Sequence, residues 1–435
     1  MVGRLAAPQS GRTWLTNSQA APRNPADVTA ATPPIRSPAA LAFGTSRVIL
    51  LAFLAVFLFV AVTEAASLQF PGTVHTDGRM ADWQAFTISG QLTAEGRAAD
   101  TYDWTVLQAE QRARSGTDGF MPWAYPPPFT LLTAPLALLP VGWSYLVTQL
   151  ALLAWFLSVV RRAAGEHLPA ALAFTLPALL TNLACGQNGF LTGALIGSFL
   201  LALRNPAAGR PTRGGWALGG MLVKPHLAVA IALLALLERR WQTLALAAAI
   251  TLGAAAVTTA LLGPAIWGAF LRSSHLATTY LWAGDYPLER MSSTYACVAR
   301  LGAGPALAMA VHTAVALAAL GALVWAWWRG VERDWLLALA GAVSLQISPY
   351  AYDYDMPVLA VAVALVWPAV LRRASGAEVA GLAVLAWLGC GNGIWVMANQ
   401  IVHPGVPASG VISLSAPALA GLIAATALIL RRPAG

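Results

Sequence analysis

Charged residues are scarce in this chain. Of its 435 residues, 58% are hydrophobic and only 10% are Asp, Glu, Lys or Arg, whereas an ordinary soluble domain carries about 25% charged residues. Apolar runs of about 20 residues, long enough for a helix to cross a bilayer, recur along the sequence. Composition therefore excludes an ordinary soluble protein and predicts a membrane-embedded helical bundle.

Several signatures of reaction chemistry are also missing. The three cysteines are far apart and lack the spacing of a disulfide framework or a metal site. The six histidines are scattered, and the sequence has no phosphate-binding lysine loop, no dinucleotide fingerprint and no Gly-x-Ser-x-Gly motif. We therefore expect no metal and no cofactor, and a reaction driven by ATP or NAD is disfavoured.

Basic side chains outnumber acidic ones, and the net charge is +8. Such a balance can indicate a nucleic-acid partner. Here the basic residues, which are all Arg except one Lys, form small clusters between the apolar runs, as is typical of cytoplasmic loops. We therefore expect membrane lipids around the chain and no nucleic acid.

The sequence divides into a tail and one membrane domain. Residues 1–45 are rich in Pro, Ala, Ser and Arg, which is typical of a disordered cytoplasmic tail. Residues 46–435 form the membrane domain, and its acidic segment 64–122 is predicted to be an extracytoplasmic loop. Within that loop, residues 82–96 and 102–114 have helical spacing and an apolar stripe, which predicts short amphipathic helices along the membrane surface.

The expected fold is all-α, a polytopic transmembrane bundle of about twelve spans. The apolar segments are 48–62, 126–140, 143–160, 168–185, 188–203, 215–237, 241–262, 303–328, 335–348, 355–371, 378–396 and 410–430. Arginine pairs alternate with the loops at 263–300, 348–355 and 397–408, so these three loops are predicted to face outward.

The first half of the chain poses a conflict of orientation. If every segment spans, the arginines at 161–162 and 204–213 face outward, against the positive-inside tendency. If they face the cytoplasm, the regions 126–160 and 215–237 each contain a half-crossing or re-entrant piece, for which prolines are available. We expect twelve full spans, because outward arginines would serve an anionic substrate.

The single lysine, Lys224, lies in the middle of an apolar segment, and Pro225 frees backbone groups at the same turn. A charge inside hydrocarbon costs several kcal/mol unless it is paired or hydrated. Lys224 is therefore a candidate partner for a phosphate or a carboxylate. The alternative is a lysine that extends to the membrane interface at a helix break.

Two further polar groups interrupt apolar segments. In Gly186-Gln187-Asn188-Gly189, the amides could bind sugar hydroxyls or cap the ends of helices. The segment 348–355 brings three tyrosines and two aspartates to an outer membrane edge. An interfacial aromatic belt would explain the tyrosines, and the acids could cap the helix that follows.

Asp82 opens the first predicted helix of the outer loop, next to Trp83 and close to Phe86. A carboxylate shielded by these rings could act as a general base that deprotonates a hydroxyl. As one of eight acids in a hydrated loop, it is a weak signal when it is taken alone.

The run Pro122-Trp-Ala-Tyr-Pro-Pro-Pro-Phe129, with its continuation to Pro140, resembles the signature of glycosyltransferase family 87. Similar residues follow in the order typical of that family: the turn 186–192, Lys224 with Pro225, the segment 267–270, and the segment 349–355. The resemblance covers about residues 45–370. It implies a GT-C fold and an enzyme that uses polyprenyl-phosphate sugars, as the mannosyltransferases of this family do.

The resemblance also implies roles for individual residues. Asp82 takes the place of the general base, and Lys224, Arg79 and Arg290 would balance the charge of the donor phosphate. Many relatives carry histidines near the Ser-Pro motif, where this chain has Asp353 and Asp355; these acids would orient sugar hydroxyls or hold a metal, and we do not favour the metal. The residues expected to bind sugar or acceptor are Gln187, Asn188, Tyr125, Tyr350, Asp353 and Asp355.

The function implied is an inverting membrane glycosyltransferase at the extracytoplasmic face of the cell (inner) membrane. It would transfer a hexose, with mannose the leading candidate, or a pentose such as arabinofuranose, from a polyprenyl-phosphate donor to a lipid or glycan acceptor. The alternative is a transporter or flippase of a lipid-linked substrate, which would share the broken helices and the buried lysine. Such a protein often has internal repeats, which we do not find, and it needs no large acidic outer loop. A purely structural membrane protein would leave Lys224 and the acidic edge unexplained.

Overall fold

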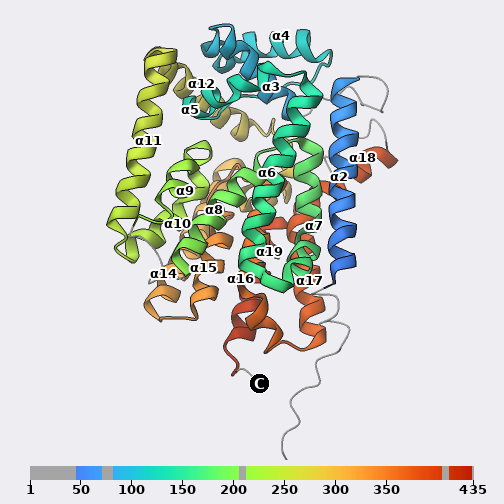
Figure 1. Ribbon diagram of the computed structural model, residues 1–435, viewed down its shortest axis with the longest axis vertical. Helices are drawn as coiled ribbons and strands as arrows, with labels where there is room; N and C mark the ends of the chain where they lie inside the picture. The colour runs from blue at the N-terminus through green and yellow to red at the C-terminus, as the bar shows by residue number, and fades with distance from the viewer. Residues whose placement is uncertain (1–45, 71–81, 205–211, 404–410, 434–435) are drawn as a thin grey trace, which may run out of the picture. The chain divides into compact units, whose positions relative to one another are not determined.

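Every apolar segment predicted from the sequence contains helix in the structure. The computed structural model describes residues 46–70, 82–204, 212–403 and 411–433, without the side chain of residue 401 (Figure 1). These residues lie in one compact unit, Ser37–Ala434. Within them the regular elements are helices, and the one β contact is an isolated bridge between Met291 and Tyr352.

The α-helices are α2 (Arg47–Gln69), α3 (Asp82–Ala94), α4 (Trp104–Ser115), α5 (Pro127–Thr133), α6 (Val141–Ala164), α7 (Leu168–Cys185), α8 (Gly189–Arg204), α9 (Gly215–Gly220), α10 (Pro225–Leu237), α11 (Trp241–Leu262), α12 (Ala265–Ala283), α13 (Thr294–Arg300), α14 (Pro305–Trp328), α15 (Arg333–Ser344), α16 (Val358–Leu371), α17 (Gly376–Cys390), α18 (Asn392–Val402) and α19 (Ser415–Leu430). Short 3-10 turns join them: η1 (Ala98–Tyr102), η2 (Ala134–Leu138), η3 (Gly165–His167), η5 (Met221–Val223), η6 (Leu288–Arg290) and η7 (Asp353–Asp355). The tail 1–45 lies outside the described residues.

Four helical stretches are long and apolar enough to cross a membrane, or five if the bent pair Gly376–Cys390 and Asn392–Gln400 counts as one. The four are Arg47–Gln69, Val141–Cys185, Trp241–Leu262 and Pro305–Trp328. The other apolar helices among the described residues are shorter. They are Pro127–Leu138, Gly189–Arg204, Pro225–Leu237, Val358–Leu371 and Ser415–Leu430.

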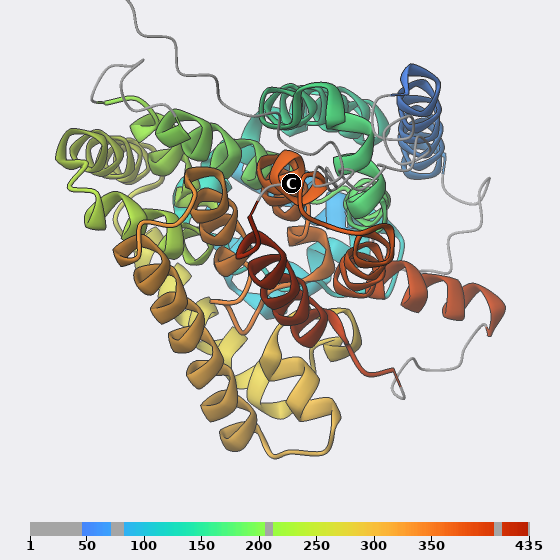
Figure 2. The same cartoon turned by 90° about the horizontal axis from the view of Figure 1, so that it is seen from below.

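Helices α2 and α11 lie at opposite edges of the bundle in both views (Figures 1 and 2). Both are apolar on all sides, yet most of their side chains are at least partly exposed, including Phe59 of α2 and Leu252 of α11. A helix that exposes such side chains is stable where the surroundings are hydrocarbon. These two helices therefore identify the protein as a membrane protein.

Several helices begin or end with arginine at one end of the bundle, which is called the basic end. Arg204, at the end of α8, contacts Asp334 at the start of α15 (2.6 Å) and the carbonyl of Ala163 near the end of α6. Arg333 pairs with Glu238, which follows α10. Because these contacts join the two halves of the chain, the arginines of the first half lie at the same end as those of the second.

The opposite end, called the cavity end, holds the described residues between α2 and α6. The backbone N–H of Gly142, at the start of α6, donates to Gln69 at the end of α2 (3.2 Å). Helix α3 packs against α5 and η2, and in Figure 1 α3, α4, α5 and α12 gather at this end. The segment 126–140 therefore begins and ends at the cavity end.

The expectation of twelve full spans is consequently wrong at two segments. Segment 126–140 does not cross, because α5 has only seven residues and is followed by a 3-10 turn that contains Pro135 and ends before Pro140. In segment 215–237, helix α9 packs along α11, and the helical backbone is interrupted at Lys224. Helix α10 then runs back to the basic end, where Glu238 pairs with Arg333. The two segments therefore match the alternative in which the arginines of the first half lie on the same side as those of the second and the regions 126–160 and 215–237 each contain a half-crossing piece.

Three further expectations need correction. Helix α3 is not a surface helix, because ten of its 13 residues are buried against α5 and η2. The predicted loop 263–300 contains the 19-residue helix α12. The predicted span 378–396 is bent by 59° between α17 and α18, at Gly391, so it is not one straight helix.

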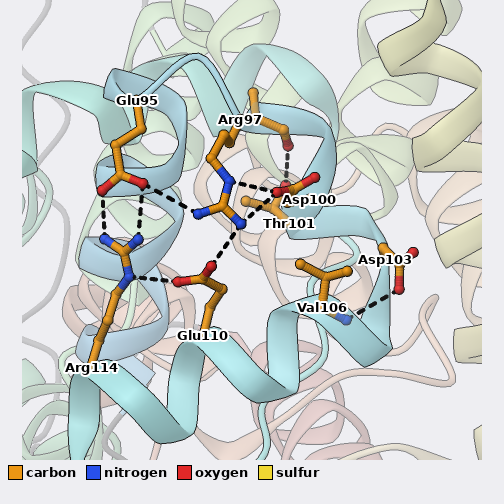
Figure 3. A network of polar contacts seen from close by, with 9 residues as sticks. Glu95, Arg97, Asp100, Thr101, Asp103, Val106, Glu110 and Arg114 are labelled. Carbon is orange, nitrogen blue, oxygen red and sulfur yellow. Dashed lines mark hydrogen bonds and ion pairs between the residues drawn. The ribbon is translucent and has the colours of Figure 1, made fainter.

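A network of ion pairs ties α3 to α4 (Figure 3). Arg114 makes two hydrogen bonds to Glu95 (2.8 and 2.9 Å) and pairs with Glu110 (2.9 Å). Arg97 joins Glu110 (2.6 Å) to Asp100 (2.8 Å). All five side chains are partly exposed, so single pairs contribute about 1 kcal/mol or less, but together they fix α4 across the chain segment that follows α3.

Candidate active site

One cavity of about 530 Å³ opens between α3, the segment 120–126, the end of α7, the break before α10, and α12. Its volume is typical of pockets that enclose small ligands. Seven of the residues singled out from the sequence line it. They are Asp82, Tyr125, Gln187, Lys224, Arg290, Tyr350 and Asp355.

Asp82 is the first residue of α3, and its carboxylate is buried at the cavity wall. The neighbouring Trp83 anchors this end of α3, because its indole N–H donates to Ser144 of α6 (3.1 Å) and its ring packs on Phe86. Burial raises the pKa of the Asp82 carboxyl, and the positive charge of Arg290 partly offsets this. Its Oδ2 is enclosed and has no hydrogen-bond partner in the described part of the chain, which is uncommon for a buried carboxylate oxygen and marks it as a candidate functional group.

Lys224 and Asp355 form a buried ion pair. The distance between Lys224 Nζ and Asp355 Oδ1 is 2.6 Å, and both side chains are almost fully enclosed. The other carboxylate oxygen of Asp355 accepts a hydrogen bond from the backbone N–H of Tyr352 (3.2 Å). Lys224 also lies 4.7 Å from the centre of the Tyr354 ring, a cation–π distance. The alternative in which Lys224 extends to the membrane interface is therefore wrong.

Arg290 and Asp353 form a second pair, in which two guanidinium nitrogens contact the two carboxylate oxygens (3.1 and 3.0 Å). Arg290 also donates to the sulfur of Cys185 (3.0 Å). The β bridge from Met291 to Tyr352 joins the two loops that carry the pair. Both acids of the 348–355 segment are thus held by cations from other parts of the chain.

These pairings bear on the roles expected for Asp353 and Asp355. Asp355 uses one oxygen for a lysine and one for a backbone N–H, and Asp353 uses both for Arg290. Among the described residues, no group of three His, Cys, Asp or Glu side chains converges as a metal site would require. In the structure the two acids therefore pair with Lys224 and Arg290, and their contact with a sugar stays a prediction.

The turn after α7 caps the ends of two helices, which is one of the two interpretations that its sequence allowed, and contact of Gln187 with a sugar stays a prediction. Gly186 has a left-handed backbone (φ 67°) at the end of α7, and Asn182 Oδ1 accepts from the N–H of Gly189 at the start of α8 (2.8 Å). Gln187 faces the cavity and accepts a hydrogen bond from the Tyr125 hydroxyl (3.2 Å). Asn188 is buried but does not line the cavity, so its contact with a sugar stays a prediction.

Other residues of the site were missed, and Arg79 lies outside the described residues. Tyr286 lines the cavity, as do Ser274 and Thr278 of α12, whereas Tyr352 and Tyr354, which also line it, belong to the segment 348–355 that the sequence singled out. The repeat of Phe270, Ser274, Ala277 and Thr278 is a helical face, which could have predicted α12. No pattern in the sequence around Tyr286 predicted that it would line the cavity.

Gly393 of α18 provides a test of the Arg290–Asp353 pair. A Cβ atom at Gly393 would meet the Asp353 carboxylate. Gly393→Ala is expected to displace this pair and to lower stability by about 1–3 kcal/mol, which thermal unfolding in detergent would measure. Sugar transfer, assayed as described below, should fall with it.

Gly381→Ala is the matched control, because Gly381 lies in the adjacent helix α17 and a Cβ there meets nothing within 4 Å. Its replacement by Ala should stabilise the protein by up to about 1 kcal/mol. Equal melting temperatures for the two variants would contradict the close contact between α18 and Asp353.

The family model described as glycosyltransferase family 87 matches residues 123–349, about half of the chain. The match includes Tyr125, Gln187, Lys224 and Arg290 of the cavity. No curated protein and no solved structure matches the chain. By the extent of the family match, this membrane protein belongs to glycosyltransferase family 87.

Proposed function

We propose that the protein transfers a hexose, with mannose the leading candidate, from a polyprenyl-phosphate sugar to a lipid or glycan acceptor. The observation that carries the proposal is Asp82, a buried carboxylate with an unpaired oxygen, in a cavity that also holds Lys224 and Arg290. A base and a pair of cations are what a displacement at a sugar phosphate needs. Family membership favours this enzyme over a transporter or flippase.

The chemistry is a single inverting displacement. The acceptor oxygen attacks the anomeric carbon of the donor, and the bond between that carbon and the phosphate oxygen breaks, with its electron pair leaving on the phosphate. Asp82 Oδ2 takes the proton of the attacking hydroxyl. The products are the glycosylated acceptor and polyprenyl phosphate, and no redox partner or cofactor is consumed.

The cations have donors to spare for the departing phosphate. Lys224 uses one of its three N–H bonds for Asp355, and Arg290 uses Nε and Nη2 for Asp353. The described residues offer no partner to Arg290 Nη1 in the hydrogen-bond geometry. Charge-assisted bonds from these two groups to the phosphate would stabilise the leaving group.

The orientation supports an extracytoplasmic reaction. The arginines at the ends of α6, α8, α16 and α19 belong to the basic end, and such residues mark the cytoplasmic side of a membrane protein. The cavity lies at the other end, so it would open outside the cytoplasm, with the donor's polyprenyl chain in the bilayer of the cell membrane. A GT-C architecture is part of this proposal.

Purified protein in lipid nanodiscs tests the activity directly. With radiolabelled polyprenyl-phosphate mannose and extracted membrane lipids, we expect the label to appear in a new glycolipid or glycan with inverted anomeric configuration. Polyprenyl-phosphate arabinofuranose serves as the comparison donor. Failure to transfer label from either donor to any acceptor would contradict the proposed function.

A further inference from the structure

The cavity contains two chemically different parts. The first, called the charged part, is formed by Asp82, Lys224, Arg290 and Asp355. The second, called the neutral part, is formed by Ser274 and Thr278 of α12 with Tyr286 and Tyr350. We propose that the neutral part is an acceptor subsite that binds a pyranoside ring, a proposal that rests on the function proposed above.

Four tyrosines line the cavity as two ring pairs. Tyr354 lies against Lys224, and its ring stacks on Tyr352 with centres 5.1 Å apart and planes at 8°. Tyr286 and Tyr350 follow in an edge-to-face contact, with centres 6.0 Å apart. All four line the cavity, so aromatic side chains border both the charged and the neutral parts.

Such a surface suits a sugar ring. One face of a pyranose presents C–H groups that pack on an aromatic ring, while its hydroxyls need hydrogen-bond partners, and tyrosine offers both a ring and a hydroxyl. The hydroxyl of Tyr286 has no hydrogen-bond partner among the described residues, and the side chain is only partly buried. It is therefore available to a ligand.

The hydroxyls of α12 extend this set of polar groups. Ser274 and Thr278 donate to backbone carbonyls of their own helix (2.9 and 3.1 Å). Their oxygens therefore remain acceptors at the cavity wall, and Thr278 Oγ1, which accepts a hydrogen bond from the Tyr350 hydroxyl (3.3 Å), keeps one further lone pair. A polyol can donate to these oxygens.

Charge separates the two subsites. The acids and the permanent cations that line the cavity belong to the charged part, and the neutral part has tyrosine rings and aliphatic hydroxyls instead. A phosphate is bound by Lys224 and Arg290, whereas an uncharged ring loses no favourable interaction by lying away from them. Asp82 borders the same cavity, so an acceptor held in the neutral part presents its hydroxyl to the base.

The test compares acceptor and donor kinetics in nanodiscs, with methyl α-mannoside and octyl α-mannoside as acceptor probes. Tyr286→Ala is expected to raise the KM for methyl α-mannoside about tenfold, while the KM for the donor changes less than about twofold. Tyr286→Phe, which keeps the ring, should lie between the wild type and Tyr286→Ala. Trp282→Ala is the control, because Trp282 is an exposed aromatic residue of the same helix α12 that does not line the cavity.

Each outcome decides between the proposals. A tenfold preference for octyl over methyl mannoside indicates a glycolipid acceptor, equal use indicates a free glycan, and both support the subsite. An unchanged acceptor KM in Tyr286→Ala, or wild-type transfer to lipid alcohols but to neither mannoside, overturns the subsite and leaves the proposed function intact. If the wild type transfers no sugar at all, the proposed function fails. Titration of methyl α-mannoside, followed by NMR, then still tests whether the sugar binds at Tyr286. Equal affinities of Tyr286→Ala and the wild type for methyl α-mannoside would overturn the subsite.

Discussion

Replacing Asp82 by Asn is expected to lower the rate of sugar transfer about 10²- to 10⁴-fold, the contribution of a positioned general base. The amide keeps the size of the side chain but cannot accept the proton of the attacking hydroxyl. Binding of the donor should persist, because Lys224 and Arg290 remain paired and in place. The measurement is initial transfer rate, with donor affinity determined separately.

The same substitution, Asp82→Asn, should lower the transfer rate without lowering the stability of the protein. Burial raises the pKa of Asp82 in the folded protein, so its contribution to stability is fully present below the ordinary pKa of about 3.9 and is lost as the pH rises through the raised value. Above the raised pKa the ionised carboxylate therefore costs stability, and in that pH range Asp82→Asn should melt no lower than the wild type. For the same reason, wild-type transfer should fall as the pH decreases through the raised pKa, since protonated Asp82 is not a base.

Asp118→Asn is the matched control, because Asp118 is an exposed acid of the same segment 64–122 and, among the described residues, its ion-pair partner is the exposed Arg112. It should transfer sugar at the wild-type rate. The base assignment is wrong if Asp82→Asn transfers as fast as Asp118→Asn. A folded Asp82→Asn that has lost donor binding would instead indicate that the carboxylate holds the substrate.

Much of the helical fold could be predicted because apolar runs in a membrane protein have few alternatives to helix. Segment 168–185 corresponds to α7 at both ends, and 241–262 corresponds to α11. Helix α12 was missed because its polar face, with Ser274 and Thr278, lines a cavity inside the protein. A sequence pattern reports that a face is polar, and it cannot distinguish bulk water from an internal cavity.

The topology of the first half failed for a related reason. Hydropathy marks the segments 126–140 and 215–237 as apolar, but it does not show whether an apolar segment crosses the membrane or returns. The deciding contacts are between distant residues, such as Arg204 with Asp334 and Arg333 with Glu238. The arginine distribution alone carried the correct answer.

The candidate site shows the same limit. Lys224 and Gln187 could be singled out individually, because each is polar where the chain is apolar, whereas Asp82 stood out from the other acids of its loop only through the family resemblance. That Lys224 pairs with Asp355 across 131 positions could not be read from the sequence. Ion pairs between distant positions depend on packing, so the sequence gives the charges but not the partners.

Replacing Lys224 by Met is expected to weaken donor binding strongly and to destabilise the protein. The buried Asp355 would lose its 2.6 Å partner, and breaking a buried ion pair by removing one member costs about 3–5 kcal/mol. Loss of activity in this single variant is therefore ambiguous, because an unfolded protein and a folded protein without a phosphate ligand both fail to transfer sugar.

The double variant Lys224→Met with Asp355→Asn separates the two effects. Asn at 355 removes the uncompensated charge and can still accept the N–H of Tyr352, so most of the lost stability should return. Because no cation is restored, donor binding should stay at least about tenfold weaker than in the wild type. Thermal unfolding and binding of polyprenyl-phosphate mannose, measured on the same nanodisc samples, give the two quantities. A double variant that recovers both stability and donor affinity would show that Lys224 serves only to neutralise Asp355, and the phosphate role would then fall to Arg290.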